Sequence, residues 1–146
     1  MGILDCLRVA FEPYRQSYTP EAFHDTVLDA GTIGTRLQMM TVFVAVRDDV
    51  VIGTIGCQVT HHQEGHLRGM AVRPECQGSN AARLLLAAAE SELKARGCRR
   101  VTLDTTLPLQ RATHFYEKSG YRRTGTTTDF FGMPLFEYAK LLQVAN

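Results

Sequence analysis

Apolar residues near the start of the chain recur at the spacing of a helix. Between Ile3 and Phe11 they lie three or four positions apart, which predicts a first helix. A second helix is expected after Thr19-Pro20-Glu21, because this tripeptide supplies an N-cap residue, a first-turn proline and an early acidic residue. Gly31 is the expected end of that helix.

Strand patterns follow these two helices. We expect strands at residues 42–46, 50–60 and 66–73, where β-branched and apolar residues dominate or alternate with polar ones. Asp48-Asp49 and Glu64-Gly65 supply the turns between them, and Gly53 with Gly56 indicates a bend or bulge in the middle strand. Together these segments predict an antiparallel meander.

The period then changes to that of a helix. Residues 80–96 carry alanines and leucines without a proline, and Gly97 suits the position after the C-cap, so a long helix is expected. The remaining expected elements are a strand at residues 100–105, a short helix from Pro108 to Gly120, and strands at residues 121–127 and 134–141.

This order of elements predicts the fold class. A strand, a long helix and a further strand form a crossover unit, which makes the two strands parallel. The other strands pair as hairpins, so we expect an α/β (α+β) fold: a mixed, mostly antiparallel central sheet with helices on both faces. Such a sheet can splay where its pairing is interrupted, and a flat ligand can enter there.

Composition narrows the classes of protein. A chain of 146 residues corresponds to one domain, expected to span residues 1–146. Sixteen Lys and Arg against fifteen Asp and Glu give a net charge of +1, too little to hold a nucleic acid in salt. No apolar run approaches the ~20 residues that span a bilayer, and the start does not resemble a signal peptide. The four cysteines lie singly, as in a cytoplasmic protein with reduced thiols.

Candidate chemistry gathers where the third strand meets the long helix. Pro74 ends the hydrogen bonding of the strand, and Gln77–Asn80 forms a loop of small residues at the helix N-terminus. Bare N–H groups and the helix dipole can hold an anion such as pyrophosphate there, with Arg73 and Arg83 on either side. The alternative is an ordinary turn flanked by two solvated arginines, because the motif of a phosphate-binding loop is absent.

Two elements resemble a known family. The stretch Met70-Ala71-Val72-Arg73-Pro74-Glu75, followed by Gln77-Gly78 and the leucine-rich helix, resembles the central signature Q/R-x-x-G-x-G/A of the GNAT superfamily of acyl-CoA-dependent N-acetyltransferases. A second family element, A-x-x-F-Y-E-K-x-G-F/Y, is matched by residues 112–121.

Three departures from the family pattern bear on the expected site. Asn80 stands where the family usually has glycine; it tolerates a positive φ, but its side chain could crowd a pyrophosphate. Leu109 stands where many members carry an asparagine that contacts the cofactor. The family's first strand normally precedes the first helix, but here a helix is expected almost at the start, so the strand is either missing, supplied by a neighbouring chain or removed by truncation.

The resemblance implies a site for acetyl-CoA as cosubstrate. The pantetheine arm would pair with the backbone at Met70 and Val72, and N–H groups from Gln77 to Ala82 would hold the pyrophosphate. An N–H near Ala71 or Val72 would stabilise the oxyanion, and Tyr116 would protonate the departing thiolate. Without the resemblance, Tyr116 is typical of a core aromatic. The implied cofactor-binding residues are Met70, Ala71, Val72, Arg73, Gln77, Gly78, Ser79, Asn80, Ala82, Arg83, Tyr116 and Lys118.

The catalytic base and the acceptor site are less defined. His66 and Glu64 are candidates for the base, with Asp104 as a third and a water relay as the alternative. The histidines around Glu64 could suggest a metal, but no further ligand pattern supports one, so none is expected. Family members build the acceptor site from the first two helices and the loop before the last strand. The residues implied here are Tyr14, Tyr18, Phe130, Phe131 and Met133.

We therefore expect a cytoplasmic N-acetyltransferase that moves an acetyl group from acetyl-CoA to a primary amine of a small molecule or peptide by direct attack. The alternative is a catalytically weak or inactive acyl-CoA-binding sensor or interaction domain, which the three departures would favour. A structural domain that binds no nucleotide is a third reading. Neither nucleic acid nor a membrane is an expected partner, and the family also allows a homodimer.

Overall fold

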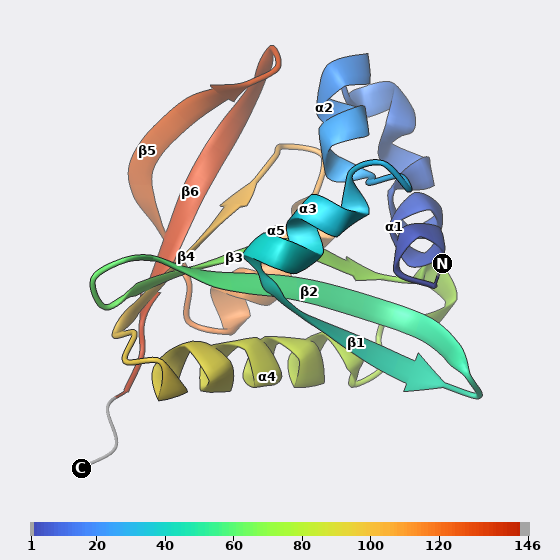
Figure 1. Cartoon of the computed structure of the whole chain (residues 1–146). Helices are drawn as coiled ribbons and strands as arrows, with labels where there is room; N and C mark the ends of the chain where they lie inside the picture. The colour runs from blue at the N-terminus through green and yellow to red at the C-terminus, as the bar shows by residue number, and fades with distance from the viewer. Residues whose placement is uncertain (1, 144–146) are drawn as a thin grey trace.

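Helical segments precede the sheet in the computed structural model, which describes residues 2–143 (Figure 1). They are α1 (Gly2–Phe11), the 3-10 helix η1 (Glu12–Ser17), α2 (Pro20–Thr26) and α3 (Ile33–Met39). Thr19 caps α2 as predicted, since its hydroxyl accepts a hydrogen bond from the N–H of Ala22 at 3.2 Å.

The expected end of the second helix at Gly31 is wrong, and α3 was not predicted. Helix α2 ends at Thr26, where Val27 turns to extended backbone. The Asp29 carboxylate then accepts the N–H groups of Gly31 and Thr32, at 2.8 and 3.0 Å. This local turn replaces helical hydrogen bonds and leads the chain into α3.

Six strands form one sheet in the order β1-β2-β3-β4-β6-β5. The strands are β1 (Thr41–Arg47), β2 (Val50–His61), β3 (Glu64–Val72), β4 (Arg100–Thr105), β5 (Arg122–Phe130) and β6 (Met133–Leu141). All neighbours pair antiparallel except β3 and β4, which pair parallel. Glu64-Gly65 is not a turn as expected: both residues belong to β3, and Gln63, with φ +60°, occupies the turn.

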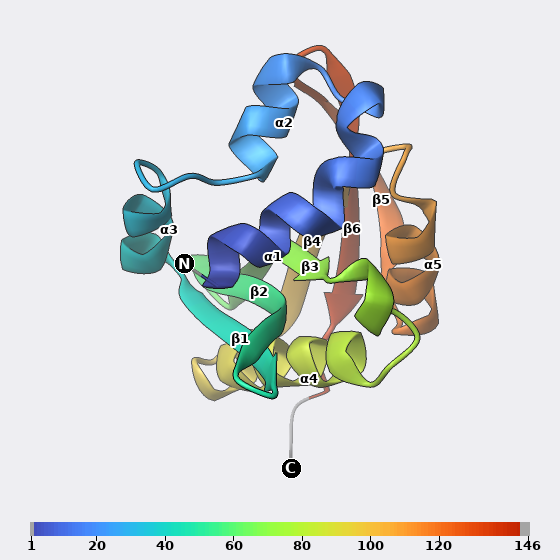
Figure 2. The same cartoon turned by 90° about the vertical axis from the view of Figure 1, so that its right-hand side faces the viewer.

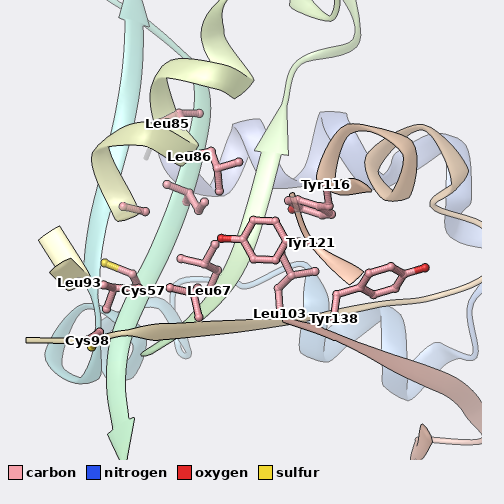
Figure 3. Close-up of a cluster of buried hydrophobic side chains, with 13 residues drawn as sticks. Cys57, Leu67, Leu85, Leu86, Leu93, Cys98, Leu103, Tyr116, Tyr121 and Tyr138 are labelled. Atoms are coloured by element: carbon pink, nitrogen blue, oxygen red, sulfur yellow. The ribbon is translucent and has the colours of Figure 1, made fainter. Parts of the chain in front are cut away.

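Helices cover both faces of the sheet, which confirms the predicted fold class. The long helix α4 (Ala81–Ala95) packs against β1, β2 and β3, and α1 crosses β2 and β3 on the opposite face (Figure 2). Helix α5 (Gln110–Lys118) begins two residues after Pro108. Leu85, Leu93 and Tyr116 from α4 and α5 share one buried cluster with Tyr121, which is fully buried (Figure 3). Within residues 2–143 no strand precedes α1, so β1 forms one edge of the sheet.

The sheet splays between its two parallel strands. The pairing of β3 with β4 ends at His66 opposite Thr102, and both strands then continue apart. Beyond this point β3 has a register shift against β2, and Gly69 adopts φ +70° within it. The predicted splay of the mixed sheet is therefore present, and it leaves one edge of β3 without a strand partner.

The splayed end of β3 is tied to the rest of the fold by Arg73. Its Nε donates to the carbonyl of Val51 at 2.7 Å, and its Nη2 lies 2.8 Å from the carboxylate of Asp5 on α1. This side chain thus joins β2, β3 and α1 next to the opening. No helix among the described residues is both long and apolar enough to cross a membrane.

Candidate active site

The loop between β3 and α4 presents bare backbone N–H groups. Gln77 and Ser79 donate their N–H groups within the loop, and Ala81 donates to the Ser79 hydroxyl. The N–H groups of Gly78, Asn80, Ala82 and Arg83 find no acceptor within residues 2–143. These groups and the positive end of the 15-residue helix α4 favour an anion at this place.

The concern that Asn80 would disturb the loop is not supported by its geometry. Asn80 has φ −76°, which any residue adopts, so its position needs no glycine for conformational reasons. The positive φ of the loop, +87°, falls on Gly78. The Asn80 side chain is exposed and does not line the cavity beside the loop.

A cavity of about 370 Å³, here called the loop cavity, runs from this loop between β3, α1 and α5. Its walls are mainly apolar, and the loop contributes Gln77, Gly78 and Ser79 to one end. The other lining residues are Ala10, Phe11, Tyr14, Met70, Ala71, Val72, Cys76, Ala82, Arg83, Leu109, Arg111, Ala112, Phe115 and Tyr116. The cavity thus has a polar end at the loop and an apolar part along β3 and α5, here called the slot.

The free edge of β3 supplies hydrogen-bonding groups to this slot. The N–H of Arg73 donates to the carbonyl of Ile52 at 2.8 Å, so Arg73 faces β2. Because successive residues of a strand alternate, the N–H and carbonyl of Val72 point to the opposite edge, which has no strand partner. An extended chain can therefore pair with β3 there.

A second cavity of about 430 Å³, here called the splay cavity, lies beyond the slot between β3 and β4. The two cavities share Phe11, Met70, Leu109, Ala112 and Tyr116. A ligand in the loop cavity and a second molecule in the splay cavity would thus meet beside Met70 and Tyr116.

Tyr116 lies at the junction of the two cavities. Tyr116 is 6 % exposed, and its ring packs edge-to-face against that of Tyr121 with 6.0 Å between the ring centroids (Figure 3). Its hydroxyl makes no hydrogen bond with a described residue, unlike that of Tyr121, which donates to Glu90 at 2.7 Å. Burial raises the pKa of Tyr116 far above its ordinary value, so the phenol keeps its proton at neutral pH.

His66 forms a polar group with Thr102 and Asp104 where the strands separate. Its Nδ1 lies 2.8 Å from the Thr102 hydroxyl, and its Nε2 lies 3.6 Å from the Asp104 carboxylate. Burial lowers the pKa of His66, while the Asp104 carboxylate acts in the opposite direction. The imidazole is therefore largely neutral at pH 7 and has a lone pair to accept a proton.

The other residues expected at the site are distributed unevenly. Arg83 lines the loop cavity, whereas Arg73 makes the structural contacts described above and Lys118 is exposed outside both cavities. Glu64 pairs with Arg100 at 2.8 Å at the start of β3, also outside both cavities. No group of three or more His, Cys, Asp or Glu between residues 2 and 143 is arranged to hold a metal ion.

The residues expected to form the acceptor site lie in different places. Tyr18 and Phe130 line the splay cavity, and the Tyr18 hydroxyl lies 2.7 Å from that of Thr106. Tyr14 lines the loop cavity instead. Phe131 is exposed at the turn between β5 and β6, and Met133 is buried in the core between α1, α2 and the sheet.

Three arginines at the cavities were not among the predicted site residues. Arg111 lines the loop cavity from the first turn of α5. Its position shortly before the Phe115-Tyr116 pair was the one signal in the sequence that could have indicated it as a site residue. Arg36 and Arg68 line the splay cavity. Arg36 carried no signal in the sequence because α3 itself was not predicted.

Comparison with known proteins identifies the family. The family model described as "Acetyltransferase (GNAT) family" matches residues 3–121. The chain therefore belongs to the GNAT acetyltransferase family, which confirms the resemblance found in its sequence. A solved structure, the PaiA N-acetyltransferase from Thermoplasma acidophilum in complex with coenzyme A, has the same fold at a TM-score of 0.78, with 19% identity, over 97% of this chain and 91% of that chain.

Two curated relatives are more similar in sequence over shorter stretches. The N-alpha-acetyltransferase 30 of Schizosaccharomyces pombe is 33% identical over 85 residues, 56% of this chain and 57% of that protein. The aminoglycoside N(6')-acetyltransferase type 1 of Stenotrophomonas maltophilia is 34% identical over 92 residues, 63% of this chain and 56% of that protein. The matched segments thus span little more than half the length of either relative.

Proposed function

We propose that the protein is an acetyl-CoA-dependent N-acetyltransferase that acts on a primary amine of a small molecule or peptide. One observation carries this proposal: the bare N–H groups of the loop, the free edge of β3 and Tyr116 lie along one continuous space that opens onto His66. Its family membership and its two curated relatives, both named as N-acetyltransferases, support the same reaction.

We expect acetyl-CoA to occupy the loop cavity, with each of its groups facing a different part of the lining. The pyrophosphate would accept hydrogen bonds from the N–H groups of Gly78, Asn80, Ala82 and Arg83, and the guanidinium groups of Arg83 and Arg111 would balance its charge. The pantetheine arm would run along the free edge of β3 within the apolar slot, where the Val72 carbonyl can accept a hydrogen bond from an amide of the arm and the Val72 N–H stays free. The thioester would then lie near the junction of the two cavities, beside Tyr116.

The acceptor amine would be deprotonated by His66. The Thr102 hydroxyl has one proton and lies 3.4 Å from the Gly65 carbonyl, so when it donates there it accepts the Nδ1–H of His66. This leaves the lone pair on Nε2, on the side of the Asp104 carboxylate, which would stabilise the imidazolium. Glu64 is not assigned this role because its ion pair with Arg100 lies outside both cavities.

Acetyl transfer then needs one proton donor and one oxyanion donor. The neutral amine attacks the thioester carbon and forms a C–N bond, and the C–S bond breaks as the oxyanion collapses. The N–H of Val72 faces the slot and would stabilise the oxyanion. The Tyr116 phenol, kept protonated by burial, would donate its proton to the departing sulfur and regain one from the nitrogen, which loses a proton as it becomes the amide, so coenzyme A leaves as the thiol.

Calorimetry and thiol release together test this function. We expect acetyl-CoA to bind the purified chain, and free coenzyme A to appear when amino acids, polyamines, aminoglycosides and peptides are offered as acceptors. Absence of binding at millimolar acetyl-CoA would refute the proposal. Binding without release of thiol by any acceptor would support the sensor or interaction domain instead.

A further inference from the structure

The splay cavity contains an arginine without an anionic partner. Arg36 extends from α3 to the cavity wall and makes no ion pair or side-chain hydrogen bond with any residue between 2 and 143. Its Nη1 lies against β3 so closely that a methyl group at Gly69 would be 2.5 Å from it. The guanidinium therefore sits over the bulge of β3, at the border of the space proposed for the acceptor.

The neighbouring charges give this arginine no ion pair of its own among residues 2–143. Arg68 is paired with Asp25, whose carboxylate lies 2.5 Å from its Nη2. Burial lowers the pKa of Arg36 to about 10; the charge of Arg68 acts in the same direction and the charge of Asp25, which is already paired with Arg68, in the opposite one. Arg36 still carries its positive charge at neutral pH, so this side of the cavity retains one unpaired positive charge in a partly desolvated place.

Another part of the same cavity carries a carboxylate. His66 and the Asp104 carboxylate line it on β3 and β4, and burial raises the pKa of Asp104. A carboxylate next to an imidazole suits an ammonium group that is about to lose a proton. The cavity thus offers an anion site and an amine site to one molecule.

Resting on the function proposed above, we propose that the acceptor is a small zwitterionic amine, such as a free amino acid, whose carboxylate binds Arg36 while its amine lies at His66 and Asp104. One carboxylate balances the single unpaired charge of Arg36, whereas a phosphate would bring a second negative charge into a cavity that already holds the Asp104 carboxylate. A polycation or a peptide without a nearby carboxylate would leave Arg36 half-buried without a partner.

Matched acceptors provide the test. Acetylation rates are compared for a set of α- and ω-amino acids, their carboxamides, and aminoalkyl phosphates of similar length, with thiol release as the readout. We expect the amino acids to show the highest kcat/KM. Losing a charged hydrogen bond of this kind lowers affinity by about tenfold to a hundredfold, so the carboxamides should fall behind by that factor.

Variants at Arg36 link the preference to this side chain. Arg36→Met keeps the length of the apolar stem and removes the charge, and it should lower the ratio of kcat/KM for each amino acid over its carboxamide by about tenfold or more. Arg36→Lys should recover part of that ratio. Arg99→Met, which changes an exposed arginine just before β4, should leave the ratio as in the unmodified protein.

Several results would overturn the proposal. If the unmodified protein prefers carboxamides or phosphates, the acceptor is not recognised through a carboxylate. If the ratio of kcat/KM for an amino acid over its carboxamide is unchanged in Arg36→Met, Arg36 does not bind that carboxylate. Either of these two results, obtained with an enzyme that still transfers acetyl groups, leaves the proposed N-acetyltransferase function intact. Absence of transfer to every amine, by contrast, removes the proposed function and this inference with it.

Discussion

Tyr116 and Tyr121 pack against each other, and we expect the hydroxyl of one to act in catalysis and the hydroxyl of the other to stabilise the fold. Tyr116 and Tyr121 are both buried, but the Tyr116 hydroxyl makes no hydrogen bond with a described residue, whereas the Tyr121 hydroxyl donates to Glu90 at 2.7 Å. We predict that Tyr116→Phe lowers kcat with little change in stability. The matched change Tyr121→Phe should lower stability with little change in kcat.

The magnitudes follow from these partners. Removing the Tyr116 hydroxyl leaves no described residue without a hydrogen-bond partner, so the free energy of unfolding should change by less than about 1 kcal/mol. Because the same change removes the general acid, kcat should fall by about ten- to a hundredfold. Removing the Tyr121 hydroxyl takes one donor from Glu90, which keeps Lys140 at 3.1 Å. A hydrogen bond to a charged group contributes about 1.5–3 kcal/mol. Because Glu90 keeps its contact with Lys140, the free energy of unfolding of Tyr121→Phe should fall by about 1.5 kcal/mol, which corresponds to a decrease in Tm of roughly 4 °C.

Steady-state thiol release and thermal unfolding measure the two effects on the same preparations. The KM for acetyl-CoA should stay within about twofold in both variants, because neither hydroxyl is assigned to ground-state binding. A Tyr116→Phe enzyme with an unchanged kcat would refute the role of Tyr116 as the acid. A large loss of stability in that variant would show that its hydroxyl has a structural partner.

Further changes test other parts of the site. Asp104 raises the pKa of His66, so Asp104→Asn should lower that pKa further and move the midpoint of the His66 ring titration, followed by NMR, to lower pH; an upward movement would contradict the pairing. Gly69→Ala places a Cβ 2.5 Å from Arg36 Nη1 at φ +70°, and should reduce the free energy of unfolding by about 1–2 kcal/mol in a denaturant titration. Arg111→Met should weaken acetyl-CoA binding in calorimetry at low salt more than at high salt, and an effect independent of salt would argue against a phosphate contact.

Much of the fold could be predicted because its signals are local. The helix at 81–95 and the strand at 100–105 follow from periodicity and flanking glycines within each segment. Helix α3 has seven residues and one buried side chain, Ile33, so its pattern is too short to stand out. After α2 the Asp29 carboxylate binds backbone N–H groups and stabilises a turn in place of further helix. The spacing of apolar residues cannot predict such a hydrogen bond.

The candidate site was predictable to a similar extent. The loop after β3 and Tyr116 each belong to a continuous motif, and the resemblance of both motifs to one family implied that they share a site. The contacts of His66 with Thr102 and Asp104 depend on the register of the parallel pair β3–β4, which is set by packing across the sheet. The approach of Arg36 to Gly69 depends on where α3 docks, and no local pattern encodes that position.

In the proposed function, the bare N–H groups at the start of α4 bind the pyrophosphate of coenzyme A. Titration of the uniformly ¹⁵N-labelled protein with coenzyme A tests this directly by following its backbone amide resonances. We predict that the amides of Gly78, Asn80, Ala82 and Arg83 show the largest shifts and saturate together with the calorimetric binding curve. If coenzyme A binds while these four amides stay unmoved, or if no amide responds at millimolar ligand, the claim is wrong.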